Sequence, residues 1–223
     1  MVTLASKLYV EGEARDRAQT SLAGTIDSLL ADLEVTTTVD VRADDFPSVA
    51  VEGPDATAAE NVLAAEFGTL PATLKTGETY TGTLVAWDDT GLTLDVGEGR
   101  QVQIPTAGLG LGPGTPTQLR TRFGLVQHLP MQFVYGDPPE LADAERDRLY
   151  EWRRGPGRVN LNSATRSEVR ATINRAGHAH DIVTVERLGV LEQSVICREG
   201  TDPPGLIAAI GEYLPSELLA VVS

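Results

Sequence analysis

Arginine side chains are concentrated in one part of this sequence, and their chemistry points to a ligand. Residues 120–175 hold ten arginines against seven acidic residues, in a chain whose net charge is −14. Residues 153–175 alone hold six arginines and one acid, Glu168. Guanidinium groups bind phosphate through paired hydrogen bonds, and clusters of them favour nucleic acid. The segment therefore predicts an RNA-binding site, which we expect to include Arg120, Arg122, Arg153, Arg154, Arg158, Arg166 and Arg170.

A second interpretation of the same arginines is structural. The chain has 32 acidic residues, so each arginine has many carboxylates with which it could pair. The segment would then hold neighbouring domains together, and the protein would be a protein–protein adaptor that could form a dimer. The two interpretations have different requirements. RNA binding requires exposed arginines in one patch, whereas the adaptor requires a carboxylate of another domain beside each arginine.

Aromatic residues in the middle of the chain could stack on nucleobases. Tyr80, Trp87 and Tyr135 lie on short predicted strands, and Arg100 is nearby in the sequence. Base stacking on an exposed ring gives affinity for single strands with little sequence preference. Aromatic residues on short strands are more often core residues, so exposure decides between the two roles. We include Tyr80, Trp87 and Arg100 in the predicted RNA-binding site.

The rest of the sequence carries weaker chemical patterns. His178, His180 and Asp181 could contact a metal with Cys197, but no fourth ligand follows at a known spacing, so a polar loop is the simpler interpretation. Residues 159–169 resemble the opening of a helix-hairpin-helix motif, but a Val/Thr-rich strand follows where that motif has a glycine-rich hairpin. Nucleophile-elbow and His-Glu-x-x-His patterns are absent from the sequence. We expect a non-enzymatic protein with no cofactor and no metal, and an enzyme is the third interpretation.

Composition predicts the environment of the protein. Only Lys7 and Lys75 are lysines among 18 basic residues, and the pI is about 4.6. Acidic, lysine-poor surfaces stay hydrated in molar salt, which favours a halophilic origin and makes net acidity a weak argument against nucleic-acid binding. No apolar run approaches the ~18 residues of a membrane span, and the N-terminus lacks a signal-peptide pattern. One cysteine excludes an internal disulfide. These features predict a cytoplasmic protein without a membrane partner.

Three compact α+β units are expected to position these residues. Over residues 1–72, the pattern predicts a ferredoxin-like βαββα unit whose last strand is missing or supplied by the next segment. Residues 73–137 have short alternating strands between turns and predict a small OB-type β-barrel. Residues 138–157 predict a connecting helix and linker. Residues 158–223 predict a complete ferredoxin-like βαββαβ unit, with its first and third strands in the centre of the sheet.

Short segments along the chain resemble known families. Five of them are similar, from end to end, to an archaeal family catalogued as domain of unknown function 2110: residues 7–12, 45–48, 123–130, 153–160 and 205–215. The charge of the chain resembles haloarchaeal members. The family name implies no activity, so no residue role can be transferred from it. In the barrel segment, residues 77–82, 95–97 and 104–105 resemble the RNA-binding barrel named from ribosomal protein S-one. We therefore expect an RNA or ribonucleoprotein partner in translation or RNA processing.

Overall fold

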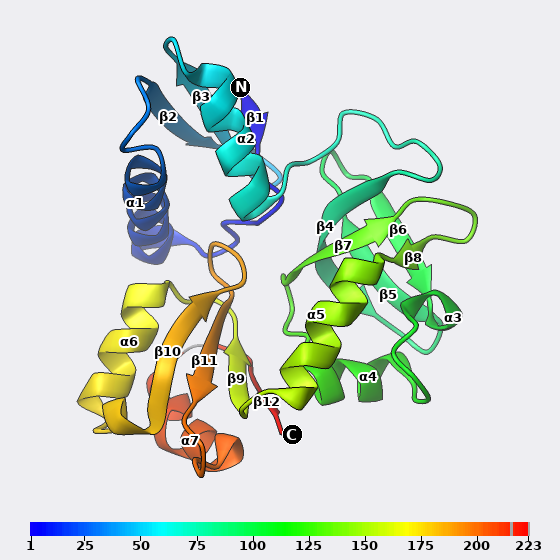
Figure 1. Cartoon of the computed structure of the whole chain (residues 1–223), viewed down its shortest axis with the longest axis vertical. Coiled ribbons are helices and arrows are strands. Elements are labelled where there is room, and N and C mark those ends of the chain that lie inside the picture. Colours follow the sequence, from blue (N-terminus) through cyan, green and yellow to red (C-terminus); the bar gives the residue numbers. More distant parts are fainter. Residues whose placement is uncertain (215, 223) are drawn as a thin grey trace.

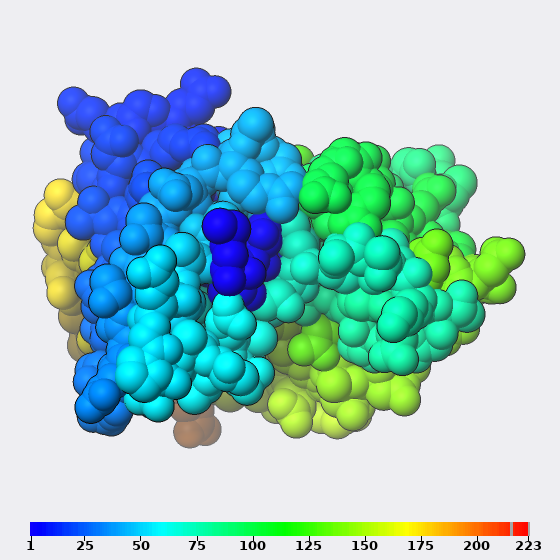
Figure 2. All heavy atoms as spheres, turned by 90° about the horizontal axis from the view of Figure 1, so that it is seen from above, coloured from blue at the N-terminus to red at the C-terminus, as the bar shows by residue number. Residues whose placement is uncertain are grey.

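The computed structural model describes residues 1–214 and 216–222. In these residues, three antiparallel β-sheets and the helices packed on them form three lobes (Figure 1). The N-terminal lobe is blue and cyan, the central lobe is green, and the C-terminal lobe is yellow to red. The N-terminal and central lobes lie side by side when the molecule is seen from above (Figure 2). Each lobe contains a cluster of buried apolar side chains. The expectation of a mixed α+β protein is confirmed.

The N-terminal unit has a three-stranded sheet and two helices. Its elements are β1 (Val2–Thr3), α1 (Gly12–Leu29), β2 (Thr36–Val41), β3 (Pro47–Glu52) and α2 (Ala56–Phe67), and the strand order is β1-β3-β2. Helical spacing of apolar residues places Leu22 of α1 in the core with Leu63 of α2. After α2, Thr69 forms a single antiparallel bridge with Leu4, which follows β1. This bridge occupies the position where a last strand was expected.

The central unit is a five-stranded sheet curled into a half-barrel. Its elements are β4 (Thr79–Trp87), β5 (Gly91–Asp95), β6 (Gln101–Pro105), α3 (Thr106–Leu109), α4 (Pro116–Phe123), β7 (Pro130–Val134), β8 (Glu140–Leu141) and α5 (Asp143–Arg154). The strand order β6-β5-β4-β7-β8 leaves β6 and β8 at the edges, so the expected barrel is an open half-barrel. Thr115 and Gln118 form a reciprocal capping box at the start of α4. Apolar residues of α4 and α5 fill the concave interior.

The C-terminal unit has a four-stranded sheet with two helices. Its elements are β9 (Arg158–Leu161), α6 (Arg166–Arg175), the 3-10 turn η1 (Ala179–Asp181), β10 (Ile182–Arg187), β11 (Gln193–Cys197), α7 (Pro203–Ile210), η2 (Gly211–Tyr213) and β12 (Leu218–Val221). The strand order is β10-β11-β9-β12, so β9 and β11 are central neighbours. Thr165 and Glu168 form the capping box that starts α6. The strand β10 follows where a helix-hairpin-helix motif would place its second helix.

The three units share parts of their cores. The loop between β10 and β11 contributes Val190 and Leu191 to the core of the N-terminal unit, while Leu188 packs against the core of the central unit. Val221 of β12 is buried in the central core. There the backbone comes so close that a Cβ on Gly124 would lie 2.5 Å from Val221. Residues far apart in the sequence are therefore packed together where the lobes meet.

Candidate nucleic-acid interface

Arg158 lies inside the protein. It begins β9 and is only 7% exposed. Its Nη1 donates a hydrogen bond of 3.3 Å to Ser194 Oγ and lies 3.5 Å from Glu186 Oε2, a carboxylate of the same unit. Its guanidinium also lies 5.0 Å from the centre of the Trp152 ring. Burial lowers the pKa of this guanidinium. The expectation of an exposed phosphate ligand is corrected here, because β9 is a central strand and all four of its residues are buried.

Arg120 joins the central unit to the C-terminal unit. Its guanidinium pairs with the carboxylate of Glu217 and lies 3.8 Å from the centre of the Trp87 ring. The other carboxylate oxygen of Glu217 accepts a hydrogen bond of 2.8 Å from the backbone N–H of Gln127. A guanidinium held by a ring and a carboxylate is engaged inside the protein, and it covers the ring face that a base would need. We therefore remove Arg120 and Trp87 from the candidate RNA site.

Four of the five arginines expected between positions 153 and 170 have no carboxylate partner among the described residues. In the part of the chain that the structure describes, Arg153, Arg154, Arg166 and Arg170 lie more than 4 Å from every carboxylate oxygen. Most arginines outside the 120–175 segment are paired within that distance, namely Arg15, Arg17, Arg42, Arg100 and Arg187. Within residues 120–175, Arg120 pairs with a carboxylate of another unit, as the adaptor interpretation requires. The unpaired arginines remain available to an anion from solution.

The unpaired arginines lie on two surfaces. Arg153 and Arg154 end α5, whereas Arg166 and Arg170 are one turn apart on α6. The C-terminal sheet lies between these two helices (Figure 1). On α6, Arg166, Arg170 and Arg175 are all exposed, and we call these three residues the α6 surface, although Arg175 lies about half a turn around the helix from Arg166. The expected single patch is thus divided, and the α6 surface is its more exposed part.

Tyr80 and Arg100 serve the central unit and its linker. The Tyr80 hydroxyl accepts a hydrogen bond of 3.0 Å from the backbone N–H of Lys75, and its ring packs against Phe133. Arg100 donates hydrogen bonds of 2.7 and 3.1 Å to the carbonyl oxygens of Pro71 and Ala72. These bonds fasten the segment between the N-terminal and central units. Arg122, on α4, is half-buried and has no carboxylate within 4 Å among the described residues.

Three titratable residues that the sequence did not single out meet where the units join. Glu192 of the C-terminal unit is fully buried, and its Oε1 accepts a hydrogen bond of 2.8 Å from the Tyr9 hydroxyl of the N-terminal unit. The Tyr9 ring stacks on His128 of the central unit, with ring centres 3.7 Å apart. Burial raises the pKa of Glu192 to about 8 and lowers the pKa of His128 to about 4. At neutral pH both groups are therefore uncharged, and the cluster is a neutral contact between the three units.

A signal for this cluster is present in the sequence. Tyr9 and His128 lie in two of the segments that carry the family resemblance, residues 7–12 and 123–130. Their separation along the chain conceals that they touch. Glu192 is one acid among 32, so its burial could not be recognised from composition.

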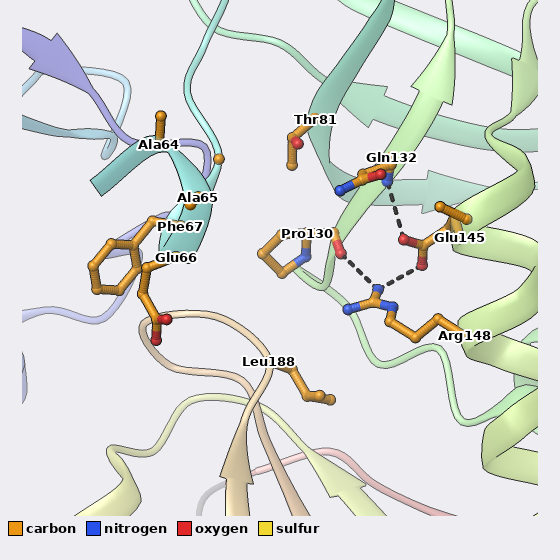
Figure 3. A pocket seen from close by; sticks show the side chains of 12 residues that line it. Ala64, Ala65, Glu66, Phe67, Thr81, Pro130, Gln132, Glu145, Arg148 and Leu188 are labelled. Atoms are coloured by element: carbon orange, nitrogen blue, oxygen red, sulfur yellow. Dashed lines mark hydrogen bonds and ion pairs between the residues drawn. The ribbon is translucent and has the colours of Figure 1, made fainter. Parts of the chain in front are cut away.

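A cavity of about 240 Å³ lies beside this junction, between α2, β7, α5 and Leu188 (Figure 3). Its main polar feature is Glu145, whose carboxylate pairs with Arg148 and accepts a hydrogen bond of 3.2 Å from the backbone N–H of Gln132. The described residues that line it include no histidine, cysteine or lysine. The Glu145–Arg148 pair joins α5 to β7 at one wall of the cavity.

The histidine loop after α6 forms an internal contact. His178 Nδ1 lies 2.7 Å from Asp181 Oδ2, and Cys197 is buried. Among the described residues, no group of three or more His, Cys, Asp and Glu side chains is arranged to hold a metal ion. Within those same ranges, no helix has the length and apolar character needed to cross a bilayer.

Family models match the chain along almost its whole length. The model of the DUF2110 N-terminal domain matches residues 1–73, that of the DUF2110 central domain matches residues 74–153, and that of the DUF2110 C-terminal domain matches residues 156–222. These matches confirm the resemblance that the short sequence segments indicated. The comparison with curated proteins gave no match.

Proposed function

We propose that this chain, which belongs to the DUF2110 family, binds RNA through its unpaired arginines and does not catalyse a reaction. The observation that carries the proposal is the α6 surface, Arg166, Arg170 and Arg175, which has no carboxylate partner within 4 Å among the described residues. In a chain with 32 acids, cations that remain unpaired are suited to a ligand that supplies its own negative charge. Arg153 and Arg154 provide a second, smaller contact.

The architecture supports the proposal by analogy of fold. The strand order β10-β11-β9-β12, with β9 and β11 central, is what a ferredoxin-like unit requires. We infer that the N-terminal unit is a shortened version of the same fold, and that the half-barrel is an opened OB-type barrel. Both folds serve as RNA-binding platforms in many proteins, although fold alone does not assign function. With the acidic, lysine-poor composition, we further propose that the RNA or ribonucleoprotein partner acts in translation or RNA processing, in the cytoplasm of a halophilic archaeon.

The adaptor is the alternative function, and Arg120 is the observation that favours it. Arg120 pairs with Glu217 across two units. Ion pairs between units also come from outside the arginine segment, as in Arg187 with Glu66 at 2.6 Å. All of these contacts lie within one chain, so they stabilise its own assembly and leave the α6 surface without an assigned partner.

The experiment that tests RNA binding measures affinity as a function of salt. Single-stranded RNA labelled with a fluorophore is titrated with protein at several KCl concentrations, and binding is followed by anisotropy. The double variant Arg166→Gln/Arg170→Gln should bind more weakly and show a flatter salt dependence, by about 0.7 in the logarithmic slope for each phosphate that the variant no longer neutralises. The matched control is Arg15→Gln/Arg198→Gln, which removes two positive charges elsewhere. Equal weakening in both variants would indicate a general charge effect and contradict the proposal.

A further inference from the structure

Among the Phe, Tyr and Trp side chains of the structure, Tyr213 has the greatest exposure. It ends the 3-10 turn η2 and is 59% exposed. Every other Phe, Tyr and Trp of the described ranges is buried or half-buried, including the predicted stacking residues Tyr80 and Trp87. A single exposed ring is unremarkable by itself. Tyr213, however, lies next to Arg175, an exposed arginine of α6.

Tyr213 lines a hollow that also contains an unpaired arginine. A cavity of about 400 Å³ is lined by Tyr213 together with Thr172, Arg175 and Ala176 of α6 and its end. The same Tyr213 and Arg175 also line an adjoining cavity of about 240 Å³, which extends to Arg17 of α1. The hollow therefore runs between α6, α1 and η2, on the side of α6 that carries Arg175.

Charge and shape in this hollow suit one nucleotide of a single strand. Arg175 has no carboxylate within 4 Å among the described residues, and its Nη2 donates a hydrogen bond of 3.3 Å to Thr172 Oγ1, which holds the guanidinium beside the hollow. Arg166 and Arg170 carry positive charge on another side of the same helix. Two carboxylates are close: Glu168 is held by Thr165 and Arg17, and Glu212 interacts with the Tyr213 hydroxyl.

We propose that Tyr213 and Arg175 form a base-stacking site for single-stranded RNA, with the base on the Tyr213 ring, the adjoining phosphate on Arg175, and phosphates further along the strand on Arg166 and Arg170. This inference rests on the proposed function, since it assigns the contact through which the same surface would hold RNA. Single-stranded RNA can turn an unstacked base onto a protein ring, whereas the bases of a duplex remain paired. Stacking is insensitive to salt screening, so it would maintain binding at a salt concentration that weakens the arginine contacts.

The test compares two kinds of variant at low and high KCl, with the same labelled single-stranded RNA. Tyr213→Ala should weaken binding about tenfold, and that factor should be the same in dilute and in molar KCl. Tyr213→Phe keeps the ring and should bind like the unchanged protein. Arg175→Gln should weaken binding at low salt and have no effect at high salt. Val183→Ala truncates another exposed apolar side chain and is the matched control for Tyr213→Ala.

The outcomes separate this inference from the function on which it rests. If Tyr213→Ala binds RNA normally while Arg166→Gln/Arg170→Gln binds weakly, the stacking site is wrong and RNA binding stands. If the unchanged protein binds no single-stranded RNA at any salt concentration, both are wrong. A thermal melt of Tyr213→Ala that matches the unchanged protein shows that its weaker binding does not come from unfolding.

Discussion

The hydroxyl of Tyr9 donates a hydrogen bond of 2.8 Å to Oε1 of Glu192, which joins the N-terminal unit to the C-terminal unit. Glu192 is fully buried on the loop between β10 and β11, and the same loop contributes Val190 and Leu191 to the N-terminal core. His128 of the central unit stacks on the Tyr9 ring. The loop therefore links the assembly of the three units to the protonation of one carboxyl group.

Stability should fall as pH rises from about 6.5 to 8. The folded pKa of Glu192, about 8, lies above its ordinary value of 4.5, so the folded state holds a proton that the unfolded chain releases. Stability from this group is complete below pH 4.5 and is lost as pH rises through 8. His128 has the opposite sign, because its pKa falls from 6.5 to about 4 and its contribution is lost as pH falls. The two effects oppose each other between pH 4.5 and 6.5, and above 6.5 only Glu192 remains.

Urea unfolding at several pH values checks this expectation. Glu192→Gln keeps an oxygen that can accept the Tyr9 hydrogen bond but cannot ionise, so its unfolding free energy should be nearly constant between pH 6.5 and 8. Glu199→Gln, at an exposed position after β11, is the control and should retain the decline. An unchanged decline in Glu192→Gln would show that another group is responsible.

Removing Arg120 should destabilise the protein strongly. The Arg120→Gln variant leaves the Glu217 carboxylate without its partner and uncovers the Trp87 ring, so we expect a decrease of about 2 kcal/mol in the free energy of unfolding. Arg122→Gln, on the same helix but without a carboxylate within 4 Å in the described ranges, should change it by less than about 0.5 kcal/mol. Equal effects of the two variants on the free energy of unfolding would mean that the Arg120–Glu217 contact adds no stability of its own.

The order of elements could be predicted because its signals are local. The capping box at Thr165 and Glu168 needs only four consecutive residues, and helical periodicity needs about three turns. Local signals also predicted that β10 would be a strand, which distinguishes this unit from a helix-hairpin-helix motif. The open form of the half-barrel was not predictable, because it depends on which edge strands meet in space.

The roles of the arginines depend on contacts between distant residues. Arg158 belongs to a basic run in the sequence, and only the position of β9 in the centre of its sheet shows that the side chain is buried. Arg120 and Glu217 are 97 positions apart, and nothing in the sequence around either residue indicates their pairing. Tyr213 likewise stands beside Arg175 only in the folded chain. The charge pattern therefore located the arginine-rich segment, but it could not distinguish its buried arginines from its exposed ones.

Amide hydrogen exchange should rank the strands of the C-terminal unit by position. Residues 158–161 of β9 and 193–197 of β11 are hydrogen-bonded on both sides, whereas β10 and β12 are edge strands. We expect the slowest exchange in β9 and β11, because their amides open only when the unit unfolds as a whole. Mass spectrometry of labelled peptides can resolve these segments. Faster exchange in β11 than in β10 would contradict the strand order.

The melting temperature should rise steadily from dilute buffer to molar KCl. The net charge of −14 leaves carboxylates that repel one another, and salt screens that repulsion over distances that shorten as its concentration rises. On α1 and just after it, Asp16, Asp27 and Asp32 are exposed and have no cationic partner within 4 Å among the described residues. The variant Asp16→Asn/Asp27→Asn/Asp32→Asn should therefore melt higher in dilute buffer and gain less from KCl. Sucrose, which stabilises proteins without screening charge, is the control and should raise both melting temperatures equally. A melting temperature that does not change with KCl would refute the halophilic interpretation of the composition.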